Sequence, residues 1–330
     1  MAKKTETPNS LESALVEINR LFGPGSIMRM SDENVADVEV IPTGVLGLDV
    51  ALGAGGLPKG RIVEIYGPFG GGKSTLALHC VAEAQKLGNR CAYIDVEYGL
   101  DPKYAGAIGV DVDSLLIAQP SNGNDAFEVI ERLVATGEIG LVIVDSVAAL
   151  VPRAELEGDY GDANVGLQAR MMSQALRKLT GLVGKTNTIL LFTNQLREKV
   201  GVIYGSPEVT PGGRALPFYA SVRIDIRRAE TNKTDGIAIS NKTKFRIVKN
   251  RVGSPYRECF ADLEFGKGFS RTGSLLDVAE ATGIVIRSGA WYTYEGEQLG
   301  QGREKSKAHL EENPSLYDEI DKRVREQIDG

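Results

Sequence analysis

The stretch from 61 to 195 alternates short runs of apolar, β-branched residues with segments of helical periodicity, and this alternation constrains the fold more than any other feature. Strand–helix–strand order is typical of a mostly parallel sheet with crossover helices, an α/β fold. Because the strand candidates are almost continuously apolar, helices should cover both faces of the sheet. The predicted strands are 61–67, 91–96, 114–119, 141–145 and 188–195, and the predicted helices lie near 74–87, 124–136 and 166–184.

The flanks of this core follow other patterns. From Ser221 the chain runs strand after strand, which predicts an antiparallel extension of the same sheet. An amphipathic helix is predicted over 10–22, and from its residues alone we expect its apolar stripe to dock on the protein's own core. Helical segments around an aromatic strand predict a small C-terminal α+β domain. The expected parts are 1–34 with the N-terminal helix and a strand, the core 35–272, and the C-terminal domain 273–330.

Composition excludes several classes of protein. The chain has 330 residues, and no apolar run approaches the roughly 18 residues that a membrane span requires. The N-terminus lacks the apolar core and cleavage site of a signal peptide, so we expect a cytoplasmic protein that does not enter the membrane. Cys80, Cys91 and Cys259 are too widely spaced for a disulfide framework or a CxxC metal site, and we expect small reduced core residues.

Charge is distributed unevenly along the chain. The formal net charge of −6 argues against a protein that coats nucleic acid through bulk charge. The stretch 223–251 is nevertheless basic, with nine Lys and Arg residues against three Asp and Glu residues. This stretch is either a solvated face of a sheet or a surface that meets phosphates.

The segment GPFGGGKS fits the pattern G-x-x-x-x-G-K-[ST] and lies between the first predicted strand and the first predicted helix of the core. Glycines at these positions let successive backbone N–H groups point at a phosphate, and the helix N-terminus adds its partial positive charge. Lys73 would reach the β- and γ-phosphates of a nucleotide, and the Ser74 hydroxyl would bind Mg²⁺. The residues expected to contact the nucleotide here are Gly67, Pro68, Phe69, Gly70, Gly71, Gly72, Lys73, Ser74 and Thr75.

Three further polar residues follow predicted strands of the sheet. Asp145 ends a buried strand, where a nucleotide-binding loop of this kind needs a carboxylate to hold Mg²⁺. Glu97 follows another strand and is the candidate that orients or deprotonates the attacking water; the alternative is a surface carboxylate in a loop. Gln195 ends a third strand beside a long loop, and its amide either senses the γ-phosphate or only hydrogen-bonds to backbone.

Two irregular stretches, 155–164 and 197–215, are rich in Gly and charged residues. Loops of this length in a compact domain are usually functional or disordered. Arg170, Arg197 and Arg214 lie at or near their ends, and apolar residues such as Val200 are interleaved. Cations that follow a backbone, together with apolar wedges, suit single-stranded nucleic acid or an unstacked duplex.

Taken together, these segments resemble the RecA family of bacterial homologous-recombination ATPases, and the similarity runs from about Leu11 to Asp329. The most specific segments are FGPGSIMRM, PTGVLGLDVALGAGGLPKGRIVEIYGP, VDSVAALVPRAELEG, MMSQALRKLTG, NQLREKVGVIYGSPE, GGRALPFYASVRIDIRR and GAWYTYEGEQLGQG. The resemblance implies a DNA-dependent ATPase that forms helical filaments on single-stranded DNA and catalyses pairing and strand exchange with homologous double-stranded DNA. It further implies a role in recombinational repair and the SOS response, and a LexA-type repressor as a partner.

The resemblance also assigns roles to individual residues. It implies that Lys73, Ser74 and Asp145 bind ATP and Mg²⁺, that Glu97 activates water, that Gln195 senses the γ-phosphate, and that Asp101 and Tyr104 meet the adenine. Loops at about 157–165 and 196–210 would bind DNA, with Arg170, Arg197, Gly212 and Gly213 at phosphates and Val200 between base triplets. Lys249 and Arg251 would reach the ATP of a neighbouring protomer, and Phe218 would couple protomers. On this basis the N-terminal helix packs on a neighbour, against the first expectation.

The chain departs from the family pattern at several positions. Phe69, Gly70 and Gly71 stand where the family has an acidic residue and two serines, and Pro217 stands where a lysine is usual. Two other functions therefore stay open at this point. A related ring-forming ATPase such as a helicase would share the core, and an ATP-gated DNA scaffold would bind both ligands without turnover.

Overall fold

The computed structural model describes residues 10–23, 26–27, 38–159, 166–198, 208–234 and 236–329. The chain divides into two units, Met1–Val38 and Glu39–Gly330. In the first unit, helix α1 spans Leu11–Phe22 and begins at Ser10, whose side chain accepts a hydrogen bond from the backbone N–H of Ser13. None of the α1 side chains is buried, and the apolar residues at its two ends, Leu11 and Phe22, are 72% and 77% exposed.

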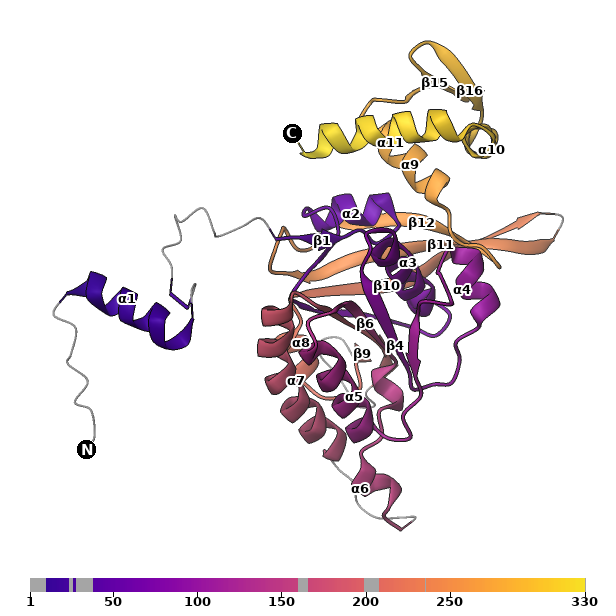
Figure 1. The fold of residues 1–330 in the computed structure, drawn as a ribbon. Coiled ribbons are helices and arrows are strands. Elements are labelled where there is room, and N and C mark those ends of the chain that lie inside the picture. The colour runs from indigo at the N-terminus through magenta and orange to yellow at the C-terminus, as the bar shows by residue number, and fades with distance from the viewer. Residues whose placement is uncertain are drawn as a thin grey trace, which may run out of the picture. The chain divides into compact units, whose positions relative to one another are not determined.

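The second unit is built around a nine-stranded sheet with the order β13-β12-β11-β10-β3-β7-β6-β4-β5 (Figure 1). Strands β10, β3, β7, β6, β4 and β5 pair in parallel, and β10 to β13 pair antiparallel. This confirms the predicted mostly parallel sheet with an antiparallel extension. The strands are β3 (Ile62–Gly67), β4 (Arg90–Asp95), β5 (Leu116–Ala118), β6 (Ile139–Asp145), β7 (Ile189–Gln195), β10 (Val222–Thr234), β11 (Ile237–Asn250), β12 (Glu258–Glu264) and β13 (Gly268–Phe269).

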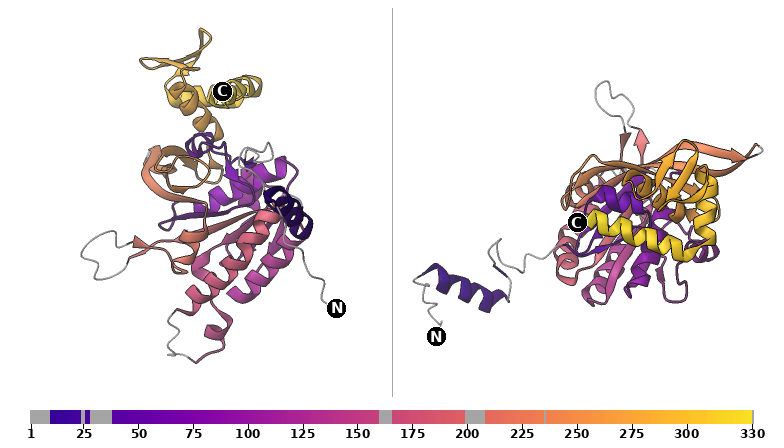
Figure 2. Two further views of the ribbon diagram at one scale, coloured as in Figure 1. Left: turned by 90° about the vertical axis from the view of Figure 1, so that its left-hand side faces the viewer. Right: turned by 90° about the horizontal axis from the view of Figure 1, so that it is seen from above.

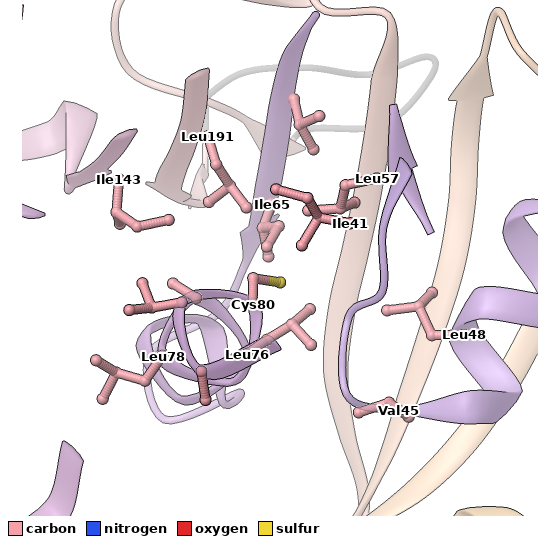
Figure 3. Close-up of a cluster of buried hydrophobic side chains, with 14 of the residues drawn as sticks. Ile41, Val45, Leu48, Leu57, Ile65, Leu76, Leu78, Cys80, Ile143 and Leu191 are labelled. Carbon is pink, nitrogen blue, oxygen red and sulfur yellow. The ribbon is translucent and has the colours of Figure 1, made fainter. Parts of the chain in front are cut away.

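Helices cover both faces of the sheet, as the apolar strands predict. Helix α3 (Lys73–Lys86) packs on one face; Figure 3 shows its side chains Leu76, Leu78 and Cys80 beside the strand residues Ile65, Ile143 and Leu191. The other face is covered by α5 (Gly123–Ala135), α7 (Leu167–Thr186) and α8 (Ala215–Tyr219), and α5 and α7 run side by side (Figures 1 and 2). All three cysteines are free: Cys80 and Cys91 are buried and Cys259 is partly buried, as expected for core thiols.

Short elements join these layers. A strand pair and a helix precede the sheet: β1 (Val40–Ile41), β2 (Leu57–Pro58) and α2 (Leu46–Leu52). The connections between the strands contain α4 (Pro102–Ile108), the 3₁₀ turn η1 (Val147–Ala149), α6 (Arg153–Leu156) and the two-stranded pair β8 (Arg197–Glu198) and β9 (Glu208–Val209). The long pair β10–β11 extends beyond the rest of the sheet (Figure 2).

The C-terminal part has its own apolar core, which includes Leu275, Tyr292 and Ile320. The sequence predicts one aromatic strand here; the structure has a three-stranded antiparallel sheet, because the flanking segments pair with that strand on both sides. Within the described ranges, no helix is long and apolar enough to cross a membrane. The elements are α9 (Arg271–Ala281), β14 (Ile286–Ser288), β15 (Trp291–Tyr294), β16 (Glu297–Gln301), α10 (Arg303–Glu312) and α11 (Pro314–Asp329).

Candidate functional site

The loop between β3 and α3 is shaped by glycine. Gly70 and Gly72 have φ angles of +70° and +95°, a region that other residues rarely adopt. A Cβ atom at Gly72 would lie 3.0 Å from Cζ of Phe269, and one at Gly71 would lie 3.1 Å from the carbonyl oxygen of Ile226. The loop therefore packs against Phe269 and Ile226 this closely only with glycine at these positions. The side chain of Phe69 is 93% exposed.

Helix α3 begins at Lys73 directly after this loop. Gly72 is its N-cap and, among the described residues, no side chain caps the helix, so the first N–H groups of α3 keep their hydrogen-bonding capacity. The Lys73 ammonium donates to the carbonyl oxygens of Pro68 at 2.7 Å and Gly67 at 3.1 Å. Burial lowers the pKa of Lys73, while the negative charges of Asp145 and Glu97 oppose this shift. The loop thus presents a cation and unpaired amides at one place, which suits an anionic ligand.

Asp145 lies at the carboxyl end of β6, next to the end of β7 and opposite Asp95 of β4. Its carboxylate is fixed by two neighbours: the Tyr93 hydroxyl donates at 2.6 Å and the Thr193 hydroxyl donates to the other oxygen. Sequence reasoning missed both Tyr93 and Thr193, since their role depends on which strands are neighbours. The result is an oriented carboxylate at the same edge of the sheet as Lys73.

Glu97 and Gln195 lie together at this edge. The Gln195 side-chain amide donates to Oε1 of Glu97 at 3.0 Å, and the Ser146 hydroxyl donates to the same oxygen. Glu97 itself is exposed, so water can reach its carboxylate. The loop behind it is held by buried Asp95, which accepts hydrogen bonds from the backbone N–H groups of Gly99 and Leu100.

Asp101 and Tyr104 belong to the short helix α4. The Asp101 side chain caps the N-terminus of α4 by accepting from the backbone N–H of Lys103 at 2.8 Å. The Tyr104 hydroxyl lies 3.0 Å from the Thr75 hydroxyl, which places α4 beside the first turn of α3. A nucleotide whose phosphates meet the loop could therefore have its base near α4.

These groups fit a nucleoside triphosphate with Mg²⁺. An ammonium, a hydroxyl at Ser74, uncapped helix N–H groups and an oriented carboxylate are the donors and ligands that such a ligand needs. Carboxylate and hydroxyl oxygens are also the ligands that Mg²⁺ prefers.

The residues predicted to meet DNA lie on the elements that flank the two irregular stretches. Arg170, Arg197 and Arg214 are all exposed, on α7, on β8 and at the N-cap of α8. Val200 and most of the two predicted loops lie outside the described residues. Gly212 and Gly213, with φ angles of +87° and +76°, close the second stretch.

The ends of the two stretches contact each other through Gln168, near the start of α7. Its Oε1 accepts from the backbone N–H of Gly212 at 3.2 Å, and its amide donates to the carbonyl oxygen of Val147 at 2.9 Å. A Cβ atom at Gly213 would lie 2.7 Å from Cβ of Ala169, so the two segments can only pack this closely with glycine. Sequence reasoning missed Gln168.

Phe218, Lys249 and Arg251 form a third group. The Phe218 side chain is 67% exposed, and its carbonyl oxygen accepts from Nζ of Lys249 at 2.8 Å and from the Arg251 guanidinium at 3.3 Å. Lys249 also donates to the carbonyl oxygen of Pro217 at 2.9 Å. The predicted inter-protomer residues are thus brought together at the C-terminus of α8.

A register shift in the β10–β11 pair sets the direction of the Lys249 side chain. Ile224 is opposite Ile247, whereas Arg223 is opposite Lys249, so Val248 is an extra residue on β11. In regular pairing Lys249 would share the apolar face of Phe245 and Ile247, because side chains alternate along a strand. The bulge places Lys249 on the opposite face, beside Arg223.

Comparison with known proteins decides the family. Residues 9–270 match the RecA N-terminal domain family, and residues 273–329 match the RecA C-terminal domain family. The chain belongs to the RecA family. It is 55% identical to Protein RecA of Saccharopolyspora erythraea over 328 residues, which cover 99% of this chain and 95% of that protein. The Acidothermus cellulolyticus protein shows the same values, and Protein RecA of Streptomyces ambofaciens is 53% identical over 98% of this chain and 87% of its own length.

Membership in the RecA family establishes what this protein does. RecA proteins are ATPases that depend on single-stranded DNA and act as recombinases in DNA repair, and they bind ATP with Mg²⁺ and form filaments on DNA. This confirms the recombinase expected from the sequence over the ring-forming helicase. The departures at Phe69, Gly70 and Gly71 stand within a chain that matches the family over nearly its whole length.

Proposed function

We propose that this chain hydrolyses ATP at the carboxyl edge of its sheet, with Lys73, Ser74 and Thr75 at the phosphates and Asp101 and Tyr104 near the base. Glu97 holds the attacking water and accepts its proton. The contact between Gln195 and Glu97 carries the proposal, since it joins the candidate phosphate sensor to the candidate base over 3.0 Å.

Mg²⁺ bound by Ser74 and Asp145 would neutralise charge on the phosphate oxygens. Asp145 is suited to this because Tyr93 and Thr193 fix its carboxylate before any ligand binds. Lys73 supplies positive charge to the β- and γ-phosphates, and the uncapped N–H groups of α3 supply more.

DNA binding is proposed at Arg170, Arg197, Gly212, Gly213 and Arg214, together with Val200. Arg197 follows Gln195 by only two residues, so a change in the contacts of Gln195 reaches the start of the second DNA-binding stretch along the chain itself. Many protomers aligned on one strand of DNA would each need few cations, which reconciles DNA binding with a net charge of −6.

Contacts between protomers are proposed at Phe218, Lys249 and Arg251, with the two cations facing the nucleotide of a neighbour. We also propose that the N-terminal helix packs on a neighbouring chain and that the loops 157–165 and 196–210 bind DNA. The proposed domain boundaries lie between residues 34 and 35 and between residues 272 and 273. The proposal also includes a LexA-type repressor as a partner and a cytoplasmic location.

Phe69, Gly70 and Gly71 replace the usual residues of the loop, and a non-hydrolysing scaffold was the alternative that these departures suggested. The position of Glu97 favours hydrolysis, since a scaffold needs no carboxylate that accepts from Gln195 and Ser146.

The test is steady-state ATP hydrolysis with and without single-stranded DNA. Strong stimulation by DNA supports the assignment of Glu97 and Gln195. DNA binding without turnover would contradict this assignment.

A further inference from the structure

A row of polar side chains crosses four neighbouring strands on the face of the sheet that α7 and α8 cover. We call it the polar row: Asn194 on β7, Glu64 on β3, Arg223 on β10 and Lys249 on β11. Glu64 and Arg223 are opposite each other in the parallel pair β3–β10, and Arg223 is opposite Lys249. Asn194 and the side chain of Glu64 are completely buried.

Glu64 binds its two neighbours with different oxygens. Nε of Arg223 donates to Oε2 at 2.6 Å, and Nδ2 of Asn194 donates to Oε1 at 3.0 Å. The Arg223 guanidinium also lies 4.6 Å from the centre of the Tyr66 ring, which fixes it from a second side. A buried carboxylate that loses such partners incurs a large free-energy cost, so we expect the three side chains to keep these contacts.

The two ends of the polar row hold the same segment of backbone, 211–218. Nδ2 of Asn194 donates to the carbonyl oxygen of Pro211 at 3.2 Å, and Nζ of Lys249 donates to the carbonyl oxygens of Pro217 and Phe218. This segment contains residues proposed to meet DNA and the residue proposed to meet a neighbouring protomer: Gly212, Gly213, Arg214 and Phe218.

The row is also connected to the hydrolysis site. The backbone N–H of Gln195 donates to Oδ1 of Asn194 at 3.0 Å, and the Gln195 side chain donates to Glu97. A change in the contacts of Gln195 therefore acts directly on the buried amide at one end of the row.

We infer that Glu64 is a positioning residue that couples the nucleotide state to segment 211–218. Its carboxylate connects Asn194, next to Gln195 at the end of β7, with Arg223 on β10. Arg223 is in turn opposite Lys249 in the strand pair β10–β11. This inference rests on the proposed function, because it takes Gln195 as the phosphate sensor and segment 211–218 as part of the DNA and protomer contacts.

The experiment measures coupling with the full chain. The affinity for a fluorescein-labelled oligothymidylate is measured in Mg²⁺-ADP and in Mg²⁺ with a non-hydrolysable ATP analogue. The readout is the dissociation constant in ADP divided by the dissociation constant in the analogue. The variants are Glu64→Gln, Arg223→Lys and the double variant Glu64→Gln/Arg223→Gln, which removes both charges of the ion pair. Glu258→Gln is the matched control, since Glu258 is a more exposed carboxylate paired with Lys244 at 2.7 Å.

We expect Glu64→Gln to lower this ratio by about fivefold or more, because allosteric coupling of this size is typical. The affinity for a fluorescent ATP analogue should change less than about twofold, and the control should behave as wild type. The double variant should also show the lowered ratio, although it leaves neither charge without its partner. If Glu64→Gln does not fold, the double variant and Arg223→Lys are tested instead.

A wild-type ratio in folded Glu64→Gln or in the double variant would overturn the inference while leaving the proposed function intact. Equal loss of nucleotide affinity and of coupling would show a purely structural role and would also overturn it. If the wild-type protein binds DNA equally in both nucleotide states, the proposed function fails first and there is no coupling for Glu64 to carry.

Discussion

Gln195 and Glu97 are 98 residues apart in the sequence, and the amide of one donates to the carboxylate of the other over 3.0 Å. Gln195 ends strand β7 and Glu97 follows strand β4, with β6 between these strands in the sheet. Oε1 of Glu97 also accepts from the Ser146 hydroxyl, so two donors hold this one oxygen. When the Gln195 amide turns to a phosphate, Glu97 loses one of these two donors.

Replacing Glu97 by Gln should abolish turnover and spare binding. The amide keeps the size of the side chain but cannot accept a proton, so we expect the rate of ATP hydrolysis to fall roughly 100-fold or more. Affinity for a fluorescent ATP analogue should stay near the wild-type value. Hydrolysis at the wild-type rate would remove Glu97 from the reaction.

Lys73→Ala should reduce kcat/KM for ATP about 100-fold or more, because it removes the ammonium group that stabilises the negative charge of the phosphates. Lys86→Ala is the matched control: it lies at the other end of the same helix and pairs with Glu83. Steady-state hydrolysis of both variants checks this. Equal kcat/KM values for the two variants would contradict the nucleotide assignment.

Arg214→Ala should weaken binding of single-stranded DNA and flatten its dependence on salt. Losing one phosphate contact reduces the slope of log K against log[salt] by about 0.7. Arg132→Ala is the control, since Arg132 is equally a surface arginine but pairs with Glu128 on α5. A salt titration of both variants decides, and an unchanged slope for Arg214→Ala would place the DNA elsewhere.

Phe218→Ala should weaken association between protomers, because an aromatic ring that is 67% exposed in the single chain would lose its contact with a neighbour. Truncation of an aromatic contact at an interface commonly costs more than about 1 kcal/mol, or roughly fivefold to tenfold in each association step. Light scattering of filament growth on DNA measures the effect. The exposed Tyr256→Ala provides a comparison, and equal growth of the two variants would exclude Phe218 from the interface.

His79 makes stability depend on pH. Burial lowers the pKa of His79 to about 3, and its Nε2 accepts from the backbone N–H of Phe269 at 2.8 Å. Its ordinary pKa is about 6.5, so the unfolded chain binds a proton below that pH while the folded chain does not. The contribution of neutral His79 to the free energy of unfolding is therefore fully present above pH 6.5. It is lost progressively as the pH falls toward 3.

We expect the free energy of unfolding of wild type to fall by about 2 kcal/mol relative to His79→Gln between pH 7 and pH 5. The Gln oxygen can still accept the Phe269 N–H, and other titrating groups are common to both proteins. Urea unfolding at the two pH values measures this difference. A constant difference would show that His79 titrates normally.

Much of the nucleotide site could be predicted because parallel strands end at one edge of a sheet. Asp145 and Gln195 end apolar strands and Glu97 follows one, so all three lie at the carboxyl edge of the parallel strands, as Lys73 does. The Gly-rich loop is also a local pattern. Both features follow from local sequence patterns and from the shared direction of parallel strands.

The supporting residues could not be predicted, because they depend on cross-strand register. Tyr93 and Thr193 lie in the middle and near the end of apolar strands, where nothing in the local pattern connects them with Asp145. Glu64 interrupts an apolar strand, and only the pairing of β3 with β7 and β10 supplies its partners. Likewise, Val248 is recognised as an extra residue on β11 only from its pairing with β10.

The extra residue Val248 has a consequence for folding. Were β10 and β11 to close without it, Lys249 would be driven into the layer of Phe245 and Ile247, and an unpaired ammonium among apolar side chains is strongly disfavoured. A hairpin with this alignment is therefore less stable. The Lys249 ammonium, which binds backbone carbonyl groups of α8 in the folded protein, thus also disfavours a wrong alignment of these two strands during folding.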